Sequence, residues 1–486
     1  MLLKHFFLNK VAHSSYILAG KSSCAIVDPQ RDVDIYIEQA REMGMTITHI
    51  LQTHLHADFV SGHMDLARQT GAKIYAPRSA ECTFDHVPLA EGETIELEHV
   101  QLRVLETPGH TPEHISYVVT DTSRGDGPIG VFVGDVLFVG DVGRPDLFPE
   151  QAKELAGQLY DSLHQKLLPL PDHVEVYPAH GAGSLCGRSI GSKWQSTIGY
   201  ERRHNAALQL DRDSFVHSLT SEMPPAPDHF ERCSEINRRG PALLADLPSL
   251  EELRPNDFRK RMEDPNVAVV DVRSYTAYAS LHVPGAWSLD LAGNFPTFAG
   301  WVLPMDEEIL IVAEDYEDAQ TAALWAHRVG LDCIVAYLYG GMAAWAMAGR
   351  RTEDVHLISA QDLHDRVTGT SNMVLVDVRA PLEFEDSHID GAVNIPAPDL
   401  RTRYAELDPD KPTFVVCSSG NRSSLAASIL KQHGFREVHN VAGGMTGYSA
   451  AGYARQCDVC ENPHGSRFFS VTLGPSALRS WQRSRR

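Results

Sequence analysis

The order of hydrophobic and polar positions divides the chain into two unlike halves. Through about residue 245, short apolar runs alternate with stretches of helical periodicity, which is the pattern of buried strands between helices. The strand-like runs are YILAG, CAIVDP, THILQTH, IYAP, VQLRVLETPGH and GVFVGDVLFVG. A Pro-rich stretch at 222–241 then predicts a domain boundary.

Beyond that boundary the chain repeats itself. The segment VVDVRSYTAYASLHVPGAWSL at 269–289 recurs 106 residues later as LVDVRAPLEFEDSHIDGAVNI, and YGGMAAWAMAG at 339–349 matches AGGMTGYSAAG at 442–452. Each copy alternates apolar strands with helices, which is typical of a parallel sheet covered on both faces. We therefore expect an α/β multi-domain protein with a larger domain at 1–245, sister domains at 246–355 and 356–456, and a tail at 457–486.

Composition narrows the environment and the partners. The 486 residues are 43% hydrophobic and 22% charged, values typical of a soluble globular protein, and this length suits roughly three domains. A net charge of −21 argues against nucleic acid or an anionic membrane surface as the main partner. We read no signal peptide and no membrane-spanning run, and the eight cysteines are sparse, so we expect a cytoplasmic protein. We also expect a homo-oligomer.

Metal-ligating residue types gather at predicted strand ends of the first domain. The turn THLHADFVSG at 53–62 places His54, His56 and Asp58 on one side of an extended segment, which suits a metal site. Three later stretches each add one candidate ligand: TPGHTPEH (His110), VGDVLF (Asp135) and YPAHGAG (His180). Ligands scattered over strand-end loops are typical of an open enzymatic metal site, whereas structural zinc uses closely paired Cys or His.

These four stretches together resemble the metallo-β-lactamase superfamily, whose fold is an αββα sandwich with metal at one edge. In its two-metal members, a histidine follows the aspartate equivalent to Asp58, and these two residues hold the second ion together with the equivalent of His180. Here Phe59 stands at that position, and a phenyl ring cannot donate an electron pair. We therefore predict a single metal, which argues against the hydrolases of the superfamily such as glyoxalase II.

The one-iron branch of the superfamily, the persulfide dioxygenases, implies a specific set of ligands. The residues equivalent to its two histidines and one carboxylate are His54, His110 and Asp135, which would hold one Fe(II) per chain and leave positions open for O2 and a sulfur substrate. That substrate would be a low-molecular-weight persulfide of the glutathione or coenzyme A type, oxidised to sulfite. The residues expected to orient the ligands are His56, Asp58 and His180. Zinc- or manganese-dependent hydrolysis is the alternative.

Other residues near these stretches have open roles. Arg144, in DVGRPDLF, is a candidate for gripping a substrate carboxylate with Asp146 holding it, and the alternative is an ion pair that stabilises the loop. Cys186 follows His180 on a glycine-rich loop and either carries a persulfide to the iron or is a buried inert thiol. His114 is expected to be a packed core histidine.

The stretch TFVVCSSGNRSSLAASIL at 413–430 reads as an apolar strand, a tight loop and a helix. A loop that wraps into a helix N-terminus directs several backbone N–H groups to one spot, which then holds an anion. With VDVR and the GGM segment around it, this stretch resembles a rhodanese domain. The resemblance implies Cys417 as the sulfur-carrying nucleophile and Arg422 as a cation for thiosulfate or sulfite, and the loop between them consists of Ser418, Ser419, Gly420 and Asn421.

The first sister copy lacks this chemistry. Alignment places Ala313 at the position of Cys417 and Asp318 at that of Arg422, with further acidic residues beside them that would repel sulfite. This copy is therefore expected to be catalytically dead and to act as a spacer or assembly surface. In the tail, Cys457 and Cys460 form a single C-x-x-C pair, for which a flexible cysteine pair is the favoured interpretation.

The complete arrangement resembles the bacterial fusions of persulfide dioxygenase, inactive rhodanese and active rhodanese. It implies iron-dependent oxidation of a persulfide to sulfite, coupled to transfer of sulfur from a second persulfide to sulfite, which gives thiosulfate. Two other interpretations stay open. One is a thioester hydrolase of the same superfamily with an attached rhodanese, and the other is a carrier of sulfane sulfur that oxidises nothing.

Overall fold

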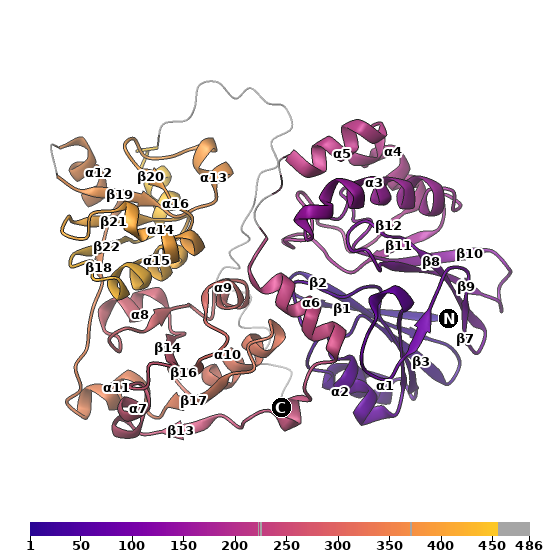
Figure 1. Ribbon diagram of the computed structural model, residues 1–486, viewed down its shortest axis with the longest axis horizontal. Helices are drawn as coiled ribbons and strands as arrows, with labels where there is room; N and C mark the ends of the chain where they lie inside the picture. The colour runs from indigo at the N-terminus through magenta and orange to yellow at the C-terminus, as the bar shows by residue number, and fades with distance from the viewer. Residues whose placement is uncertain (222, 224–225, 370–371, 455–486) are drawn as a thin grey trace, which may run out of the picture.

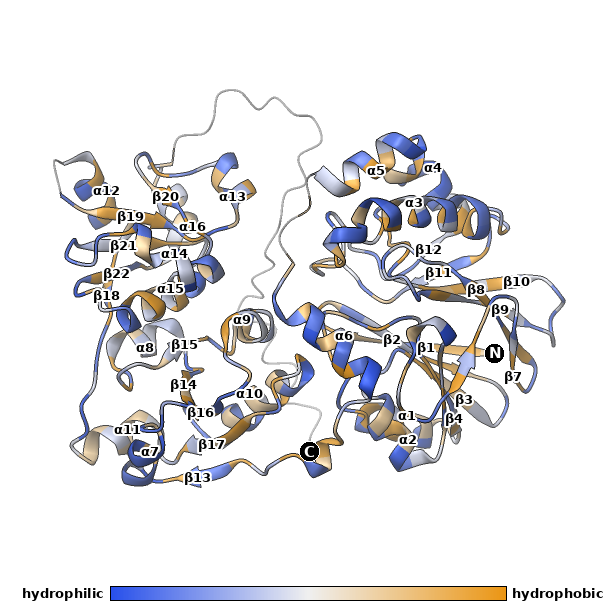
Figure 2. Ribbon diagram, in the orientation of Figure 1, coloured by the Kyte–Doolittle hydropathy of each residue, from blue (hydrophilic) through white to orange (hydrophobic). Residues whose placement is uncertain are grey.

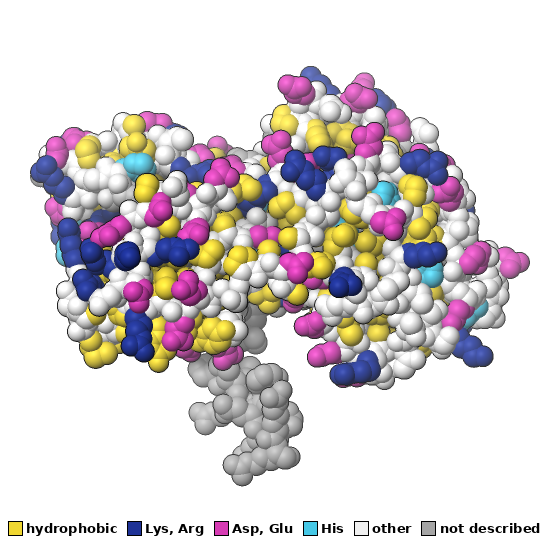
Figure 3. Space-filling model, turned by 60° about the horizontal axis from the view of Figure 1, so that its bottom comes forward, with side chains coloured by type: hydrophobic (Ala, Val, Ile, Leu, Met, Phe, Trp, Pro, Cys, Tyr) yellow, Lys and Arg dark blue, Asp and Glu magenta, His cyan; other side chains and the backbone are white. Residues whose placement is uncertain are grey.

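The computed structural model describes residues 1–221, 223, 226–369 and 372–454. Figure 1 shows an N-terminal lobe, in indigo to magenta, beside a second lobe in which the two sister domains are stacked. None of the helices in this described part is long and apolar enough to cross a membrane. On the face drawn in Figure 3, acidic and basic side chains are interspersed over both lobes.

The N-terminal domain is an αββα sandwich, as predicted. Its first sheet runs in chain order through β1 (Leu2–Leu8), β2 (His13–Ala19), β3 (Ser23–Val27), β4 (Thr46–Leu51), β5 (Lys73–Pro77) and β6 (Val87–Leu89). Its second sheet has the order β12-β11-β10-β9-β8-β7, with β7 (Thr94–Leu97), β8 (Val100–Glu106), β9 (Ile115–Asp121), β10 (Pro128–Gly134), β11 (Glu175–Pro178) and β12 (Ser196–Thr197). Helices α1 (Asp34–Glu42) and α2 (His63–Thr70) cover one outer face, and α3 (Ala152–Ser162), α4 (Ile198–His204) and α5 (Arg212–Ser221) lie over the other (Figure 1).

Alternation along a strand explains why these runs are apolar throughout. In β2, Tyr16 and Leu18 point into the core between the sheets, whereas Ile17 and Ala19 pack in the layer with α1 and α2. Both faces of the strand are thus excluded from water, and all of β2 is buried. Figure 2 shows the same hydrophobic colouring along strands of both lobes.

The two sister domains have the same topology, which confirms the internal repeat. The first has the parallel sheet order β13-β17-β16-β14-β15 and the second β18-β22-β21-β19-β20, so each strand has a counterpart at the same place. The strands of the first are β13 (Glu251–Leu253), β14 (Val267–Asp271), β15 (Trp287–Ser288), β16 (Glu308–Val312) and β17 (Ile334–Leu338), and its helices are α7 (Pro255–Arg261), α8 (Tyr275–Ser280), α9 (Phe295–Val302), α10 (Tyr316–Arg328) and α11 (Gly341–Met347). The strands of the second are β18 (His356–Ile358), β19 (Val374–Asp377), β20 (Val393–Asn394), β21 (Thr413–Val416) and β22 (Val438–Val441), and its helices are α12 (Ala360–Thr368), α13 (Pro381–Asp386), α14 (Leu400–Arg403), α15 (Asn421–Gln432) and α16 (Gly444–Ala450).

The repeated Asp-x-Arg pairs make the same contacts in both copies. Arg273 binds the carboxylate of Asp271 and donates to the carbonyl of Leu281 at 2.7 Å. Arg379 binds Asp377 in the same way and donates to the carbonyl of Ser387 at 2.6 Å. All four side chains are buried, so the structural role expected for these pairs matches their placement.

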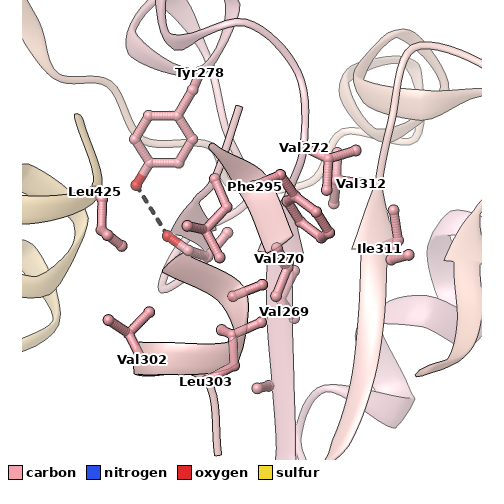
Figure 4. Close-up of a cluster of buried hydrophobic side chains, with 14 of the residues drawn as sticks. Val269, Val270, Val272, Tyr278, Phe295, Val302, Leu303, Ile311, Val312 and Leu425 are labelled. Atoms are coloured by element: carbon pink, nitrogen blue, oxygen red, sulfur yellow. Dashed lines mark hydrogen bonds between the residues drawn. The ribbon is translucent and has the colours of Figure 1, made fainter. Parts of the chain in front are cut away.

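The sister domains also share one hydrophobic core. Figure 4 shows Leu425, from α15 of the second domain, packed toward Tyr278, Phe295 and Val302 of the first. Between the same two domains, the Ser288 hydroxyl lies 2.7 Å from that of Ser424. The first sister domain is therefore packed firmly against the second.

Part of the Pro-rich stretch predicted as a boundary is a helix, α6 (His229–Arg239), that docks on the first domain. Asn237 of α6 donates to the carbonyls of His56 and Phe59 at 2.8 and 2.9 Å and accepts from the Ser61 amide at 2.8 Å. The segment HFERCSEINRR forms a helix despite the prolines before it, because its periodic buried residues pack against the first domain. The stretch thus braces the predicted metal loop.

Candidate metal centre and sulfur-transfer loop

Loops at one edge of the sandwich bring the predicted metal ligands together. His54, His110 and Asp135 follow the carboxyl ends of β4, β8 and β10, and all three are buried. Their ligand atoms lie within 4.8 Å of one another. The Nε2 atoms of His110 and His54 lie 3.3 and 3.7 Å from one oxygen of Asp135, so they converge on that carboxylate.

Hydrogen bonds orient both imidazoles for metal binding. His110 donates its Nδ1–H to the carbonyl of Arg144 at 2.8 Å, and its buried Nε2 has no hydrogen-bond partner among the described residues. The Thr53 hydroxyl donates to Asp28 at 2.8 Å, which leaves its oxygen to accept from His54 Nδ1 at 2.9 Å. Each ring therefore presents a lone pair on Nε2, and the residues present fit a metal ion.

Burial and mutual charge set the protonation states that a metal requires. Burial lowers the pKa of His110 and lowers that of His54 well below its usual value. Burial alone would raise the pKa of Asp135, but His180, His54 and His110 outweigh it and hold this pKa well below its usual range. Neutral imidazoles and an ionised carboxylate are the forms that bind metal.

The residues predicted to orient the ligands lie directly behind them. His180 bridges two carboxylates, with Nδ1 2.7 Å from Asp135 and Nε2 2.8 Å from Asp58. Burial lowers the pKa of His180, but Asp135 and Asp58 outweigh it and raise this pKa well above its usual value. His56 Nε2 lies 3.2 Å from a carboxylate oxygen of Asp28.

A second group of ligand atoms lies beside the first. Asp58, His180 and Cys186 also place their ligand atoms within 4.8 Å of one another. The sequence argument for one metal counted Asp58 and His180 only, so Cys186 is a third donor that it missed. Phe59 is fully buried here, with its ring centroid 4.1 Å from that of His13 and 4.5 Å from that of His56.

Burial raises the pKa of the Cys186 thiol well above its usual value, and Asp58 and Asp135 add to this effect. A thiol that stays protonated is a poor nucleophile. Of the two roles left open, the inert buried thiol fits this surrounding better than a carrier of persulfide.

Arg144 does not match the predicted role of a substrate grip. Its guanidinium is buried and binds Asp146 with two hydrogen bonds of 2.7 Å, while a third bond of 3.2 Å reaches the carbonyl of Leu185. Its amide donates to the carbonyl of Cys186 at 3.0 Å. The alternative, a loop-stabilising ion pair, is the better description, because these donors are turned inward.

The loop after β21 wraps around Cys417. Its buried Sγ accepts from the Gly420 amide at 3.1 Å and from the Ser423 hydroxyl at 3.3 Å. Gly420 has a φ of 112°, a conformation that side chains disfavour, so glycine permits this curl. Ser419 is exposed at the rim and Asn421 begins α15, whose N-terminus points at the sulfur. One backbone amide and one hydroxyl of this segment thus converge on the sulfur, an arrangement compatible with the predicted anion cradle.

Arg422, expected to offer a cation to thiosulfate or sulfite, has an ion-pair partner within its own domain. It forms a two-point ion pair with Glu383, at 2.6 and 2.8 Å, and also donates to the Ser418 hydroxyl at 2.6 Å. Burial raises the pKa of Glu383, but the hydrogen bonds and charge of Arg422 outweigh it and lower this pKa to about 2. The guanidinium is thus largely neutralised before any anion arrives.

The first sister copy has no nucleophile at the equivalent place. Ala313 ends the strand as Cys417 does, and a Cβ on Gly341 would meet its carbonyl, as a Cβ on Gly444 would meet that of Cys417. Asp315 caps α10 by accepting from the amide of Asp318 at 2.9 Å. Burial raises the pKa of Asp318, and neighbouring acidic residues raise it further. The backbone contacts after the strand are thus the same in both copies, but Ala313 and Asp318 replace the thiol and the guanidinium.

Comparisons with known families agree with this division. The model of the metallo-β-lactamase superfamily matches residues 8–180, and that of the rhodanese-like domain matches 254–348 and 359–451. The crystal structure of a metallo-β-lactamase from Staphylococcus aureus subsp. aureus COL is 33% identical with a TM-score of 0.62, and the alignment covers 70% of this chain and 98% of that one. This chain belongs to the metallo-β-lactamase superfamily. It carries two tandem rhodanese-like domains in addition.

Named relatives within the superfamily have different activities. A mitochondrial persulfide dioxygenase of Mus musculus is 28% identical over 247 residues, which cover 49% of this chain and 88% of that protein. A hydroxyacylglutathione hydrolase of Erythrobacter litoralis is 35% identical over 215 residues, which cover 43% of this chain and 77% of that protein. The metallo-β-lactamase domain thus has both oxidising and hydrolysing relatives.

Some supporting residues escaped the sequence analysis. His114 is packed in the core as expected, yet its Nε2 also accepts from the Asp135 amide at 3.0 Å. Glu113 accepts from the Leu55 amide at 2.9 Å. Both lie in the stretch TPGHTPEH, where an acid and a second histidine in a strand-end loop were a usable signal. Cys457 and Cys460 lie outside the described residues.

Proposed function

We propose that the metallo-β-lactamase domain is a persulfide dioxygenase that holds one Fe(II) with His54, His110 and Asp135. When bound, ferrous iron supplies redox chemistry for which two imidazoles and one carboxylate leave open positions. The observation that carries the proposal is the convergence of two Nε2 lone pairs on a single oxygen of Asp135. Overall, RSSH, O2 and water would give RSH, sulfite and two protons: O2 is the oxidant, water supplies the third oxygen of sulfite, and the S–S bond is cleaved.

A cavity of about 520 Å³ beside the metal loop offers a place for the persulfide. Leu55 and Ala57 of the metal loop, Phe148, and Phe230 of α6 form its apolar walls. Glu235 and Arg238 line another part of it and pair with each other at 2.7 Å. Pockets of this size hold ligands as large as a small peptidic thiol. These walls would align the substrate.

The neighbouring residues favour one metal over two. Phe59 contributes no donor, and His180 Nδ1 is hydrogen-bonded to Asp135 while its Nε2 lies 2.8 Å from an oxygen of Asp58. Cys186 is the third possible ligand in the group of Asp58 and His180, so replacing it tests whether the chain binds a second metal. Wild type and Cys186→Ser should both bind about one iron per chain when purified without oxygen. Two metals in the wild type and one in the variant would overturn the single-metal proposal.

The second rhodanese-like domain would transfer the sulfur. The Cys417 thiolate attacks the outer sulfur of RSSH, RSH leaves with the proton, and an enzyme persulfide forms. Sulfite then attacks that outer sulfur, thiosulfate forms, and the thiolate is restored. The Gly420 amide and the Ser423 hydroxyl, which donate to Sγ, stabilise the anionic sulfur in each state.

The deciding experiment measures oxygen uptake with glutathione persulfide, together with sulfite and thiosulfate. Wild type should consume O2 and yield thiosulfate once a second persulfide is available. Cys417→Ser should consume O2 at a similar rate but accumulate sulfite. Thioester hydrolysis without O2 uptake would select the hydrolase, which the hydroxyacylglutathione hydrolase relatives make the second candidate. Sulfur loading at Cys417 without O2 uptake would select a carrier.

A further inference from the structure

A cavity of about 490 Å³ lies where all three domains meet. One wall is the rim of the sulfur-transfer loop, formed by Ser419, Asn421 and Arg422. The facing wall comes from the catalytically dead domain, chiefly α9 and the loop before it. Leu185 of the metallo-β-lactamase domain completes the lining. We call this cavity the junction chamber.

Contacts from the dead domain fix the position of the active loop. A Cβ on Gly420 would lie 2.9 Å from the Tyr275 ring, and one on Gly293 would lie 2.9 Å from the Asn421 side-chain nitrogen. The two sister domains thus approach each other closely at Gly420 and at Asn421. Lys10 of the first domain donates to the carbonyl of Gly293 at 2.9 Å, so the facing loop is itself held in place.

The junction chamber is too large and too apolar for an inorganic donor alone. Cavities of about 300–1000 Å³ suit organic ligands, whereas thiosulfate would fill only a small part of this one. Phe298 and Trp301 of α9 and Leu425 of α15 provide apolar wall. Asp290 and Asn294 lie on the same lining and offer polar groups to an organic carrier.

The charges of the lining select among carriers. Asp290 and Glu383 are carboxylates, and the one cationic side chain among the lining residues, Arg422, is already paired with Glu383. A carrier rich in phosphate would bring its negative charges against these groups. Ammonium and amide groups would meet acceptors instead.

From this geometry we propose that the junction chamber binds the organic part of the persulfide that loads Cys417, and that the dead domain sets donor specificity. The carrier is a small peptidic thiol without phosphate groups. Its sulfane sulfur enters the loop while its organic part rests against α9. The inference rests on the sulfur-transfer half of the proposed function and is independent of the iron chemistry. The dead copy is thereby assigned a binding role in place of the lost nucleophile.

The test uses the full chain without oxygen, so that the metal site oxidises nothing. Thiocyanate is measured with cyanide as acceptor and three alternative donors, namely glutathione persulfide, coenzyme A persulfide and thiosulfate. The uncatalysed rate and the rate of Cys417→Ser are subtracted. Wild type should have a kcat/KM at least tenfold higher with glutathione persulfide than with coenzyme A persulfide. Equal values, or a preference for coenzyme A persulfide, would overturn the assigned carrier class.

Thr297→Trp fills the junction chamber from α9, and Thr321→Trp is its matched control on the exposed surface of α10. The first should lower kcat/KM with glutathione persulfide about tenfold while thiosulfate use stays within about twofold. The control should change neither. A loss shared equally by both donors, or no loss with either, overturns the proposal.

Phe298→Ala is a second, independent variant. It removes an apolar side chain that lines the junction chamber, whereas Thr297→Trp fills the chamber. Phe298→Ala should raise the KM for glutathione persulfide several-fold and leave kcat and thiosulfate use nearly unchanged. An unchanged KM contradicts the proposal even if Thr297→Trp fails to fold. Oxygen uptake is followed separately in aerobic samples, so failure of the dioxygenase proposal and failure of this one are distinguishable.

Discussion

At the scale of single residues, two Thr-His dipeptides differ in what their hydroxyl groups hold. Thr48 and Thr53 each place Oγ1 close to Nδ1 of the following histidine, at 2.8 and 2.9 Å. Only Thr53 is anchored to a buried carboxylate, that of Asp28. The chain Asp28–Thr53–His54 therefore orients a candidate metal ligand, whereas His49 of the pair Thr48–His49 is not part of the candidate ligand groups among the described residues.

Thr53→Val should weaken metal binding about 10- to 100-fold, because it removes the acceptor that orients His54 and leaves the size of the side chain nearly unchanged. Metal affinity would be measured by anaerobic competition with a chelator. Thr48→Val, which removes the equivalent hydroxyl next to His49, should leave the affinity unchanged. Equal effects of the two variants would contradict the orienting role of Thr53.

The Glu383–Arg422 pair predicts a pH effect at the active loop. Glu383 has a folded-state pKa of about 2 against a usual value of 4.5, so its ionised form stabilises the fold above about pH 4.5. That stabilisation is lost as the pH falls toward 2. Glu383→Gln lacks it at every pH.

The difference in thermal midpoint between wild type and Glu383→Gln should therefore shrink as the pH is lowered from 6 toward 3. Since both partners are partly exposed, the difference should be modest and should decrease with added salt. A difference that is constant over this pH range would show that the charge of Glu383 contributes nothing.

At the scale of elements, α6 contacts the metal loop on one side and the first rhodanese-like domain on the other. Asn237 makes three hydrogen bonds to backbone groups between His56 and Ser61, and its side chain is buried. Arg232 of α6 reaches the other way, to the carbonyls of Gly300 and Val329 at 3.1 and 3.0 Å. The helix thus links the metal loop to the dead domain.

Asn237→Ala should cost about 1–3 kcal/mol of stability, because buried backbone groups of the metal loop lose their partners. It should also speed release of the metal. Asn205→Ala removes another buried asparagine, whose bonds go to Asp141 and Glu201. That control should lower stability in urea unfolding without changing the rate at which a chelator removes the metal.

The sequence predicted what is written locally. The sandwich, the repeated sheets and the cradle around Cys417 follow from strand periodicity, internal similarity and one loop motif. The docking of α6 was not predicted, because the sequence around Asn237 contains no signal for its hydrogen bonds to residues 56–61. The capture of Arg422 by Glu383 was missed for the same reason, since the partners are separated by 39 residues. Long-range pairing of polar groups depends on a fold that local patterns do not describe.

At the scale of the whole molecule, the first rhodanese-like domain contacts the segments around both proposed sites. Its Arg328 carbonyl accepts from the Val60 amide, next to Phe59, at 2.7 Å. The guanidinium group of Arg328 donates two hydrogen bonds, of 2.7 and 2.8 Å, to the carboxylate of Asp32 in the first domain. On its other side this domain shares its core with the active copy (Figure 4). This domain therefore contacts both of its neighbours.

Two buried leucines of the active domain separate its private core from the shared one. Leu363 is fully buried in the cluster that belongs to the second sister domain alone, whereas Leu425 lies in the cluster common to both. Truncating either to alanine should cost about 2–5 kcal/mol, because each leaves a cavity. Leu363→Ala should lower hydrogen-exchange protection in the active domain only. Leu425→Ala should lower it in β14 and α9 of the first rhodanese-like domain as well, since residues of both elements belong to the same hydrophobic cluster as Leu425. If protection in the dead domain stays unchanged, the two copies fold independently, and the facing wall of the junction chamber is then not held by the shared core.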